Sequence, residues 1–150
     1  MRTPEETKEI ARRFMEEVFN KRNLKYAEES LADDFVEHNP IDPRMGNGKS
    51  GAIATFQAIL DSTPDLKTEI LDLVATADRV AIRATFAGTD SGTGWGAMMG
   101  APATGKAFSA EGIDVAIIDN EGKFREHYGL FDAPGMMVQL GLMPAPGAEG

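Results

Sequence analysis

The chain has 150 residues, of which 42% are hydrophobic, and it contains no cysteine. This length suits one domain with a core of its own, and no apolar run is long enough to cross a membrane. The formal net charge of −9, with scattered lysines and arginines, argues against nucleic acid as a partner. The lack of cysteine and of an apolar leader favours a cytoplasmic protein.

The first part of the sequence is predicted to be helical. Thr3-Pro4-Glu5-Glu6 is typical of a capping box, and apolar residues then recur at helical spacing. A short second helix is predicted over 24–31, followed by a brief strand over 34–40 that a proline ends. Ser50 is expected to cap a third helix, which Thr63-Pro64-Asp65 ends.

The second part is predicted to form strands over 66–75, 79–89, 106–118 and 123–132. Residues 133–141 are predicted to form a short closing helix, and residues 144–150 a disordered tail. Helices followed by antiparallel strands indicate a single α+β domain over residues 1–143. A sheet that curls around helices can leave a ligand pocket at one end.

The last predicted strand is the most informative segment. Side chains alternate between the two faces of a strand, so Asp132 is expected to lie with Tyr128 and Leu130, opposite His127. An aspartate among apolar neighbours loses water and becomes a stronger proton acceptor, as a general base requires. The alternative is that Asp132 caps the helix beginning near Ala133, and this segment alone favours the cap.

Several other chemistries lack the residues that they need. Neither His38 nor His127 has a second histidine or a cysteine at ligand spacing, so no metal site is expected. Gly48-Lys49-Ser50 resembles the end of a phosphate-binding loop, but Pro43 stands where that loop requires glycine. Without a Gly-x-Ser-x-Gly motif or a cysteine, covalent catalysis is not expected.

Seven segments, taken together, resemble the SnoaL-like polyketide cyclase family. In chain order they are His38-Asn39-Pro40, Thr63-Pro64-Asp65-Leu66, Asp78-Arg79-Val80-Ala81, Gly88-Thr89-Asp90-Ser91-Gly92, Ala103-Thr104-Gly105-Lys106, Gly122 to Tyr128 and Gln139-Leu140-Gly141. The resemblance covers residues 5–143. It implies a cystatin-like cone of the nuclear transport factor 2 type, with a deep apolar pocket. It also implies a homodimer or higher homo-oligomer formed through the outer face of the sheet, and no cofactor.

The resemblance further implies a reaction. Family members remove a proton from carbon beside a carbonyl group and close a ring in a polyketide ester by intramolecular aldol condensation. Asp132 matches the family's catalytic carboxylate, which is the general base. Asn39 matches an asparagine near the substrate, and Tyr128 stands where many members carry tryptophan. The expected ligand is a small apolar or polycyclic molecule.

The sequence departs from the family at two histidine positions, which hold Asp90 and Asp114. Strand parity places Asp114 on the pocket face, and Asp90 follows Phe86 in alternation. Mutual repulsion would keep one aspartate protonated, so Asp114 is the expected acid partner of Asp132. The alternatives are a satisfied polar group for Asp114 and a solvated loop residue for Asp90.

The residues expected to contact substrate are His38, Asn39, Phe56, Phe86, Asp90, Trp95 and Tyr128. Trp95 lies in a glycine-rich loop that is predicted to form the pocket rim, whereas His127 is expected to be structural. The same cone hosts dehydratases, isomerases, epoxide hydrolases and non-catalytic binding proteins, so the fold does not decide among them. An apolar pocket with Asp132 on its wall would favour an enzyme.

Overall fold

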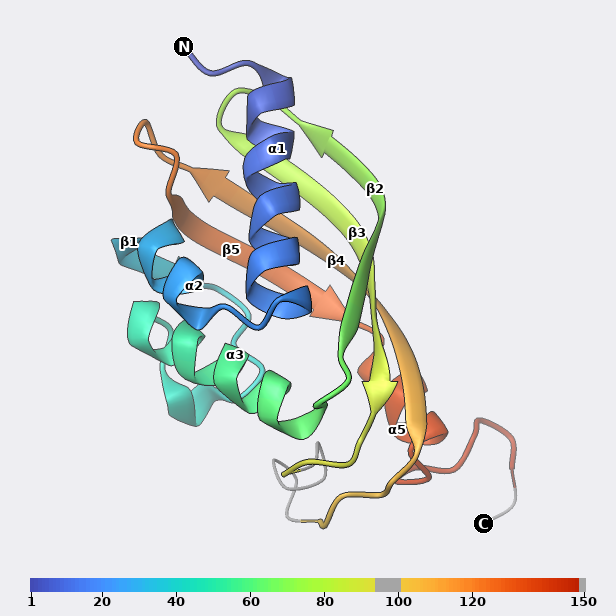
Figure 1. Cartoon of the computed structure of the whole chain (residues 1–150). Helices are drawn as coiled ribbons and strands as arrows, with labels where there is room; N and C mark the ends of the chain where they lie inside the picture. Colours follow the sequence, from blue (N-terminus) through green and yellow to red (C-terminus); the bar gives the residue numbers. More distant parts are fainter. Residues whose placement is uncertain (94–100, 149–150) are drawn as a thin grey trace.

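A computed structural model describes residues 1–93 and 101–148. Within this part of the chain a single twisted sheet has the strand order β1-β5-β4-β3-β2. The strands are β1 (Leu31–Glu37), β2 (Lys67–Ala75), β3 (Arg79–Thr89), β4 (Ala107–Ile118) and β5 (Phe124–Phe131). Neighbours from β2 to β5 are antiparallel, and β1 runs parallel to β5 at the sheet edge. The predicted α+β class is confirmed, with a sheet that is curved but not closed (Figure 1).

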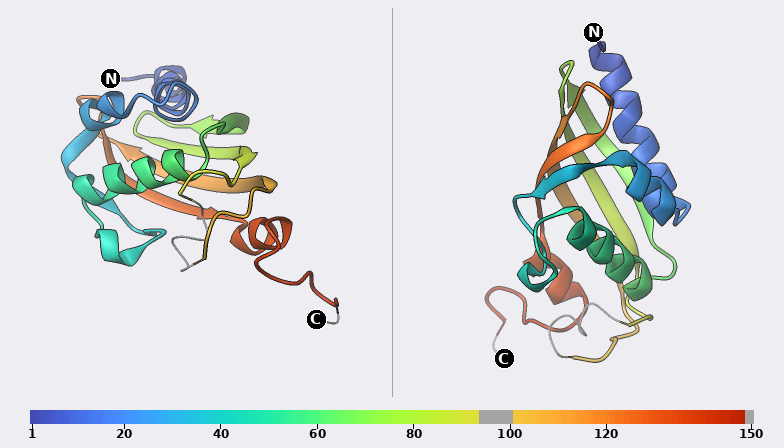
Figure 2. Two further views of the ribbon diagram at one scale, coloured as in Figure 1. Left: turned by 60° about the horizontal axis from the view of Figure 1, so that its bottom comes forward. Right: turned by 90° about the vertical axis from the view of Figure 1, so that its left-hand side faces the viewer.

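The helices lie mainly against one face of this sheet. They are α1 (Pro4–Met15), the π-helical η1 (Glu16–Asn20), α2 (Leu24–Ser30), the 3₁₀ segment η2 (Pro43–Met45), α3 (Lys49–Ser62) and α5 (Ala133–Gln139). The first helix contacts β2 and β3, α3 contacts β1, and α5 packs at the end of β4. Figure 2 shows that the molecule narrows toward the end where the N-terminus lies. No helix in the described ranges is both long and apolar enough to span a membrane.

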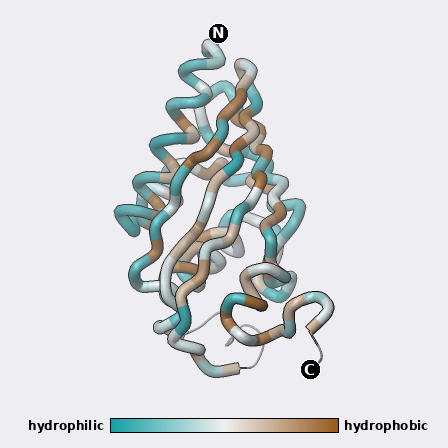
Figure 3. Tube along the Cα trace, turned by 90° about the vertical axis from the view of Figure 1, so that its right-hand side faces the viewer, coloured by the Kyte–Doolittle hydropathy of each residue, from teal (hydrophilic) through white to brown (hydrophobic). Residues whose placement is uncertain are grey.

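Five phenylalanine rings join the helices to the sheet. Their centroids lie 4.8 to 6.3 Å apart in edge-to-face contacts that link Phe14, Phe19, Phe56, Phe86 and Phe124. Each such pair contributes about 0.5–1.5 kcal/mol beyond the burial of its area. In Figure 3 the hydrophobic segments run along the strands, whereas much of α1 is hydrophilic, as an amphipathic covering helix requires.

The predicted helix ends are only partly correct. The capping box is confirmed, because the Thr3 side chain accepts from the Glu6 backbone and the Glu6 side chain accepts from the Thr3 backbone. The prediction that Ser50 caps the third helix is wrong. The helix already begins at Lys49, with extended Gly48 before it and no side-chain cap. The predicted strand over 34–40 in fact begins at Leu31, whose side chain is buried in the sheet.

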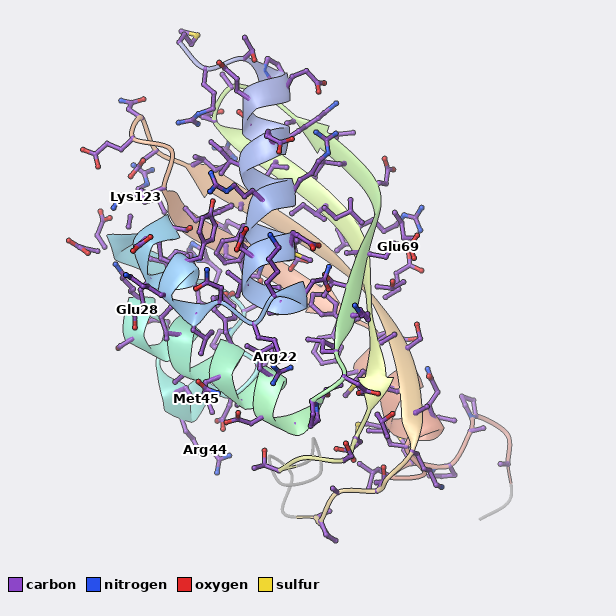
Figure 4. All side chains as sticks on the ribbon, in the orientation of Figure 1. Arg22, Glu28, Arg44, Met45, Glu69 and Lys123 are labelled. Atoms are coloured by element: carbon purple, nitrogen blue, oxygen red, sulfur yellow. The ribbon has the colours of Figure 1, made fainter. Side chains whose placement is uncertain are left out.

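Arg22 connects the turn after η1 to the end of α3. Its φ of 58° lies in the left-handed region that non-glycine residues seldom adopt. The guanidinium donates to the backbone oxygens of Leu60 at 2.6 Å and of Thr63 and Pro64 at 3.3 Å, and Figure 4 labels it beside α3. The last carbonyls of a helix lack intrahelical donors and attract a cation, so Arg22 caps α3 from outside.

Candidate functional site

An apolar cavity of about 170 Å³ lies between the inner face of the sheet and the helices. Phe14, Phe56, Phe86 and Phe131 are among the rings on its wall, together with Met15 and Met136 from α1 and α5. Among the described residues, the ionisable side chains on this wall are Glu37, Asp114 and His127. A mostly apolar hollow with a few polar groups in one place is typical of a small-molecule site.

The three ionisable side chains form one hydrogen-bonded row across adjacent strands. Glu37 stands at the end of β1, His127 in β5 and Asp114 in β4. The Nδ1 atom of His127 lies 2.5 Å from Glu37 Oε2, and its Nε2 atom lies 2.8 Å from Asp114 Oδ1. The side chain of His127 is 30% exposed, and those of Glu37 and Asp114 are 15% and 22% exposed. We refer to these three residues as the acid–histidine row.

The charge on His127 follows from its two neighbours. Burial of the ring lowers the pKa of His127, but hydrogen bonds and Coulomb attraction to Asp114 and Glu37 outweigh that effect and raise it to about 9. The imidazole is therefore protonated at neutral pH and donates from both nitrogens.

The free atoms of the row decide what it can do chemically. Both nitrogens of His127 are occupied, and Glu37 Oε1 accepts from the Asn39 backbone at 3.0 Å. Asn39 Oδ1 accepts in turn from Gly129 N at 3.2 Å. Within the described residues, Asp114 Oδ2 has no hydrogen-bond partner, so it is the oxygen available to a ligand. No described cluster of three or more acidic, histidine or cysteine side chains is arranged to hold a metal ion.

Four of the residues predicted to form the site do line the cavity. They are Asp114, Asn39, Phe56 and Phe86. Strand parity in β4 thus placed Asp114 correctly on the inner face. Trp95 lies outside the described residues.

Asp132 is exposed and does not line the cavity, so the prediction of an aspartate desolvated in an apolar pocket is wrong. Its Oδ1 accepts from Gly135 N at 2.9 Å, so the residue caps α5. The cause is a bulge in β5. Ile117 pairs with Glu126, but Ile118 pairs with Phe124, which leaves Arg125 as an extra residue. The role of Asp132 as general base remains a prediction, but the burial on which that prediction was based is absent.

The predicted grouping is confirmed, since Tyr128, Leu130 and Asp132 are all exposed and His127 faces the other way, but the assignment of the Tyr128 face to the pocket is wrong. Strict alternation from Phe124 would turn Tyr128 inward, whereas the extra residue turns His127 inward and leaves Tyr128 42% exposed. Tyr128 stacks on His38 on the outer side, with ring centroids 4.1 Å apart and planes 2° from parallel. His38 Nε2 lies 2.9 Å from Glu126 Oε2. Neither His38 nor Tyr128 lines the cavity, contrary to prediction.

Asp90 is completely buried, so its interpretation as a solvated loop residue is wrong. Its Oδ2 accepts from the backbone nitrogen and the hydroxyl of Thr104, each at 3.0 Å. The backbone of Asp90 also bonds to Lys106 and Gly105. The residue lies outside the cavity wall, where it joins the two chain segments that follow β3 and precede β4.

The residues that sequence reasoning missed are Glu37 and His127. Glu37 belongs to an edge strand whose parallel pairing with β5 joins segments about 90 residues apart, and no local pattern indicates it. His127 lies close to Asp114 because Asp114 pairs with Gly129 across β4 and β5. The pairing register of β4 and β5 was the information needed to identify His127 as a site residue.

Comparison with known proteins agrees with this fold. The family model for the SnoaL-like polyketide cyclases matches residues 9–140, which is most of the chain. The chain belongs to the SnoaL-like polyketide cyclase family. No curated protein sequence matches it.

Solved structures of this fold include several SnoaL-like proteins. TsrD from Streptomyces laurentii is 27% identical, with a TM-score of 0.75, and the alignment covers 90% of this chain and 94% of TsrD. IdmH, a proposed polyketide cyclase from Streptomyces antibioticus, is also 27% identical, with a TM-score of 0.74 and coverage of 90% and 98%. A proposed SnoaL-like cyclase from Jannaschia is 18% identical, with a TM-score of 0.77 and coverage of 94% and 95%, and supports the fold alone.

Proposed function

We propose that this chain removes a proton from carbon beside a carbonyl group and closes a ring in a polyketide-like molecule by an aldol-type reaction, without a cofactor. The observation that carries the proposal is the acid–histidine row on the wall of an apolar cavity. Family membership supports the same chemistry. Because the rest of the described wall is almost entirely apolar, the substrate is a small apolar or polycyclic molecule.

We assign the general base to Asp114. His127 is charged and both of its nitrogens are occupied, so it has no lone pair with which to accept a proton. Asp114 lines the cavity and its Oδ2 atom has no partner among the described residues, so this oxygen can accept the proton. This assignment replaces the expectation that Asp132 is the base and Asp114 the acid, because Asp132 is exposed.

The reaction then runs through one carboxyl group. The carbon–hydrogen bond breaks and its proton moves to Asp114 Oδ2. The electron pair left on carbon attacks a second carbonyl carbon of the same molecule, forming the new carbon–carbon bond. The resulting alkoxide oxygen takes the proton back from Asp114. His127 holds Asp114 in place, and Glu37 holds the ring of His127.

Asn39 supplies a candidate donor to the substrate carbonyl. Asn39 lines the cavity and its Oδ1 accepts from Gly129 N, and its amide nitrogen donates no hydrogen bond among the described residues. A hydrogen bond from this nitrogen to the carbonyl oxygen would stabilise the charge that develops when the proton leaves.

Exchange of carbon-bound hydrogen for deuterium tests the assignment of the base. Methyl 2-acetylbenzoate serves as a probe because it carries acidic hydrogens beside a ketone, next to an aromatic ester. Wild-type protein should accelerate deuterium incorporation at the acetyl group in heavy water, measured by proton NMR. Asp114→Asn should slow the catalysed rate by about 100-fold or more. Asp132→Asn, the matched carboxylate-to-amide control, should stay within about twofold because Asp132 lies outside the cavity.

The opposite pattern, in which Asp132→Asn loses exchange and Asp114→Asn keeps it, would return the base to Asp132. A wild-type protein that binds aryl ketones but accelerates neither exchange nor ring closure would favour a non-catalytic binding protein. The same base would also serve a dehydratase or isomerase, and a product without a new ring would identify one.

We further infer that the protein forms a homodimer through the outer face of the sheet. Large apolar side chains stand exposed there: Ile113 at 58% on β4, Leu130 at 74% on β5 and Val74 at 59% on β2. Ile113 pairs directly with Leu130 across β4 and β5. A set of neighbouring exposed apolar residues of this kind is typical of a protein interface.

A further inference from the structure

Gly129 is the cross-strand partner of Asp114, and both residues line the cavity. A Cβ atom at this position would lie 2.5 Å from Asp114 Oδ1, 2.6 Å from His127 Cε1 and 3.0 Å from His127 Nε2. These atoms belong to the two partners of the Asp114–His127 hydrogen bond. A side chain at position 129 would therefore occupy the space that this hydrogen bond fills.

The two partners cannot both move away without losing their contact. His127 is held on its far side by Glu37 at 2.5 Å, so its ring cannot shift without stretching that bond. Asp114 has a short side chain with few alternative positions on the same face of β4. An added methyl group would thus separate Asp114 from His127 or His127 from Glu37.

The backbone conformation at position 129 does not require glycine. Gly129 is not among the glycines whose φ is positive, so an ordinary residue could adopt its conformation. Glycine weakens a strand interior, because it costs more conformational entropy and packs no side chain. What glycine provides at position 129 is the space that the Asp114–His127 hydrogen bond occupies.

We propose that Gly129 is a positioning residue that leaves room for Asp114 and His127 to meet on the cavity wall. The inference rests on the proposed function for its catalytic consequence, since Gly129 acts through Asp114 and touches no reacting atom. Its structural content, that a side chain at 129 breaks the acid–histidine row, can be tested independently of any activity.

The test compares Gly129→Ala with Gly112→Ala. Gly112 also lines the cavity on the inner face, but a Cβ there would meet Leu130 and Phe131 instead of the row. Imidazole NMR during a pH titration reports the pKa of His127, and His38→Gln in each protein leaves a single histidine to observe. In Gly129→Ala the pKa of His127 should fall from about 9 by at least one unit toward 6.5, whereas Gly112→Ala should keep it near 9.

Exchange of the methyl 2-acetylbenzoate probe adds the catalytic readout. It should slow by about tenfold or more in Gly129→Ala. A folded Gly129→Ala protein that keeps the pKa of His127 near 9 would overturn the positioning role. If the pKa falls as expected but the wild-type protein shows no exchange, Gly129 keeps its role and the proposed function fails.

A double variant covers the case in which Gly129→Ala does not fold. Removing the carboxylate in Asp114→Ala opens the space that the new methyl group needs and frees one side of His127. Gly129→Ala/Asp114→Ala should therefore fold, with a melting temperature close to that of Asp114→Ala alone. If alanine at position 129 lowers the melting temperature equally with and without the Asp114 carboxylate, the clash does not depend on the Asp114–His127 hydrogen bond and the inference is wrong.

Discussion

His127 keeps its proton at pH values at which an ordinary imidazole has lost it. An imidazole between two carboxylates is a structural cation at neutral pH, so it cannot serve as the neutral base that histidine often provides. Its role is to fix Asp114 by a short charged hydrogen bond, which is stronger than a neutral one. In the proposed reaction, Asp114 therefore supplies the reactive oxygen and His127 orients it.

This proton makes a pH-dependent contribution to stability. The pKa of His127 rises from 6.5 to about 9 on folding, so the folded chain keeps a proton that the unfolded chain releases. The contribution is complete below pH 6.5 and is lost as the pH rises through about 9. Urea unfolding of wild type and His127→Gln should show a free-energy difference that shrinks over this range.

A difference between wild type and His127→Gln that stays constant from about pH 6 to pH 10 would contradict the raised pKa. Titration by imidazole NMR gives the value directly. In that measurement His38→Gln serves as the control, because His38 lies on the outer face and its loss should leave the His127 titration unchanged.

The helices can be predicted from local patterns, because their ends depend on residues nearby in the chain. Thr3 and Glu6 form their cap within one turn, and the end of α3 coincides with Thr63. The parallel pairing of β1 with β5 has no such local cause, so Glu37 could not be placed. No local sequence pattern indicates the bulge at Arg125 either, although the bulge decides which face of the sheet carries His127.

The external cap on α3 should be a measurable part of stability. Arg22→Ala removes a guanidinium that bonds three backbone oxygens at the end of this helix. We expect a loss of about 1–3 kcal/mol in the free energy of unfolding, because carbonyls that lose a charged donor keep their desolvation cost. Urea denaturation measures the loss.

Arg44→Ala is the matched control for Arg22→Ala. Arg44 is exposed and pairs only with neighbouring Asp42 among the described residues, so its removal should change stability little. Figure 4 labels both arginines. Equal effects of the two substitutions would show that the contacts of Arg22 to α3 carry no particular weight.

At the scale of the whole molecule, the two faces of the sheet differ in what they present. The inner face carries the cavity and the acid–histidine row, and the outer face carries the exposed apolar side chains. Figure 3 shows hydrophobic residues interleaved with hydrophilic ones along the strands, as expected when both faces are in use.

The proposed homodimer predicts that Leu130→Lys gives a monomer. A lysine at this exposed position would have to bury a charge without a partner in the dimer, which is costly. Light scattering coupled to size exclusion should show a dimeric mass for wild type and half that mass for the variant. Glu28→Gln on α2 changes the net charge by the same amount away from this face and should remain dimeric. A monomeric wild type, or a dimeric Leu130→Lys, would argue against this interface.

The extra residue in β5 has a consequence for how such a chain can diverge. Inserting one residue between Glu126 and His127 would turn the imidazole outward and bring the phenol ring of Tyr128 into the hollow, whereas deleting Arg125 would only remove the bulge and keep His127 inside. The insertion would keep every amino acid of the chain, yet the chemistry offered to a ligand would be replaced. The number of residues between the bulge and His127 thus decides which side chain faces the hollow, so an insertion there should be far less tolerated than a substitution.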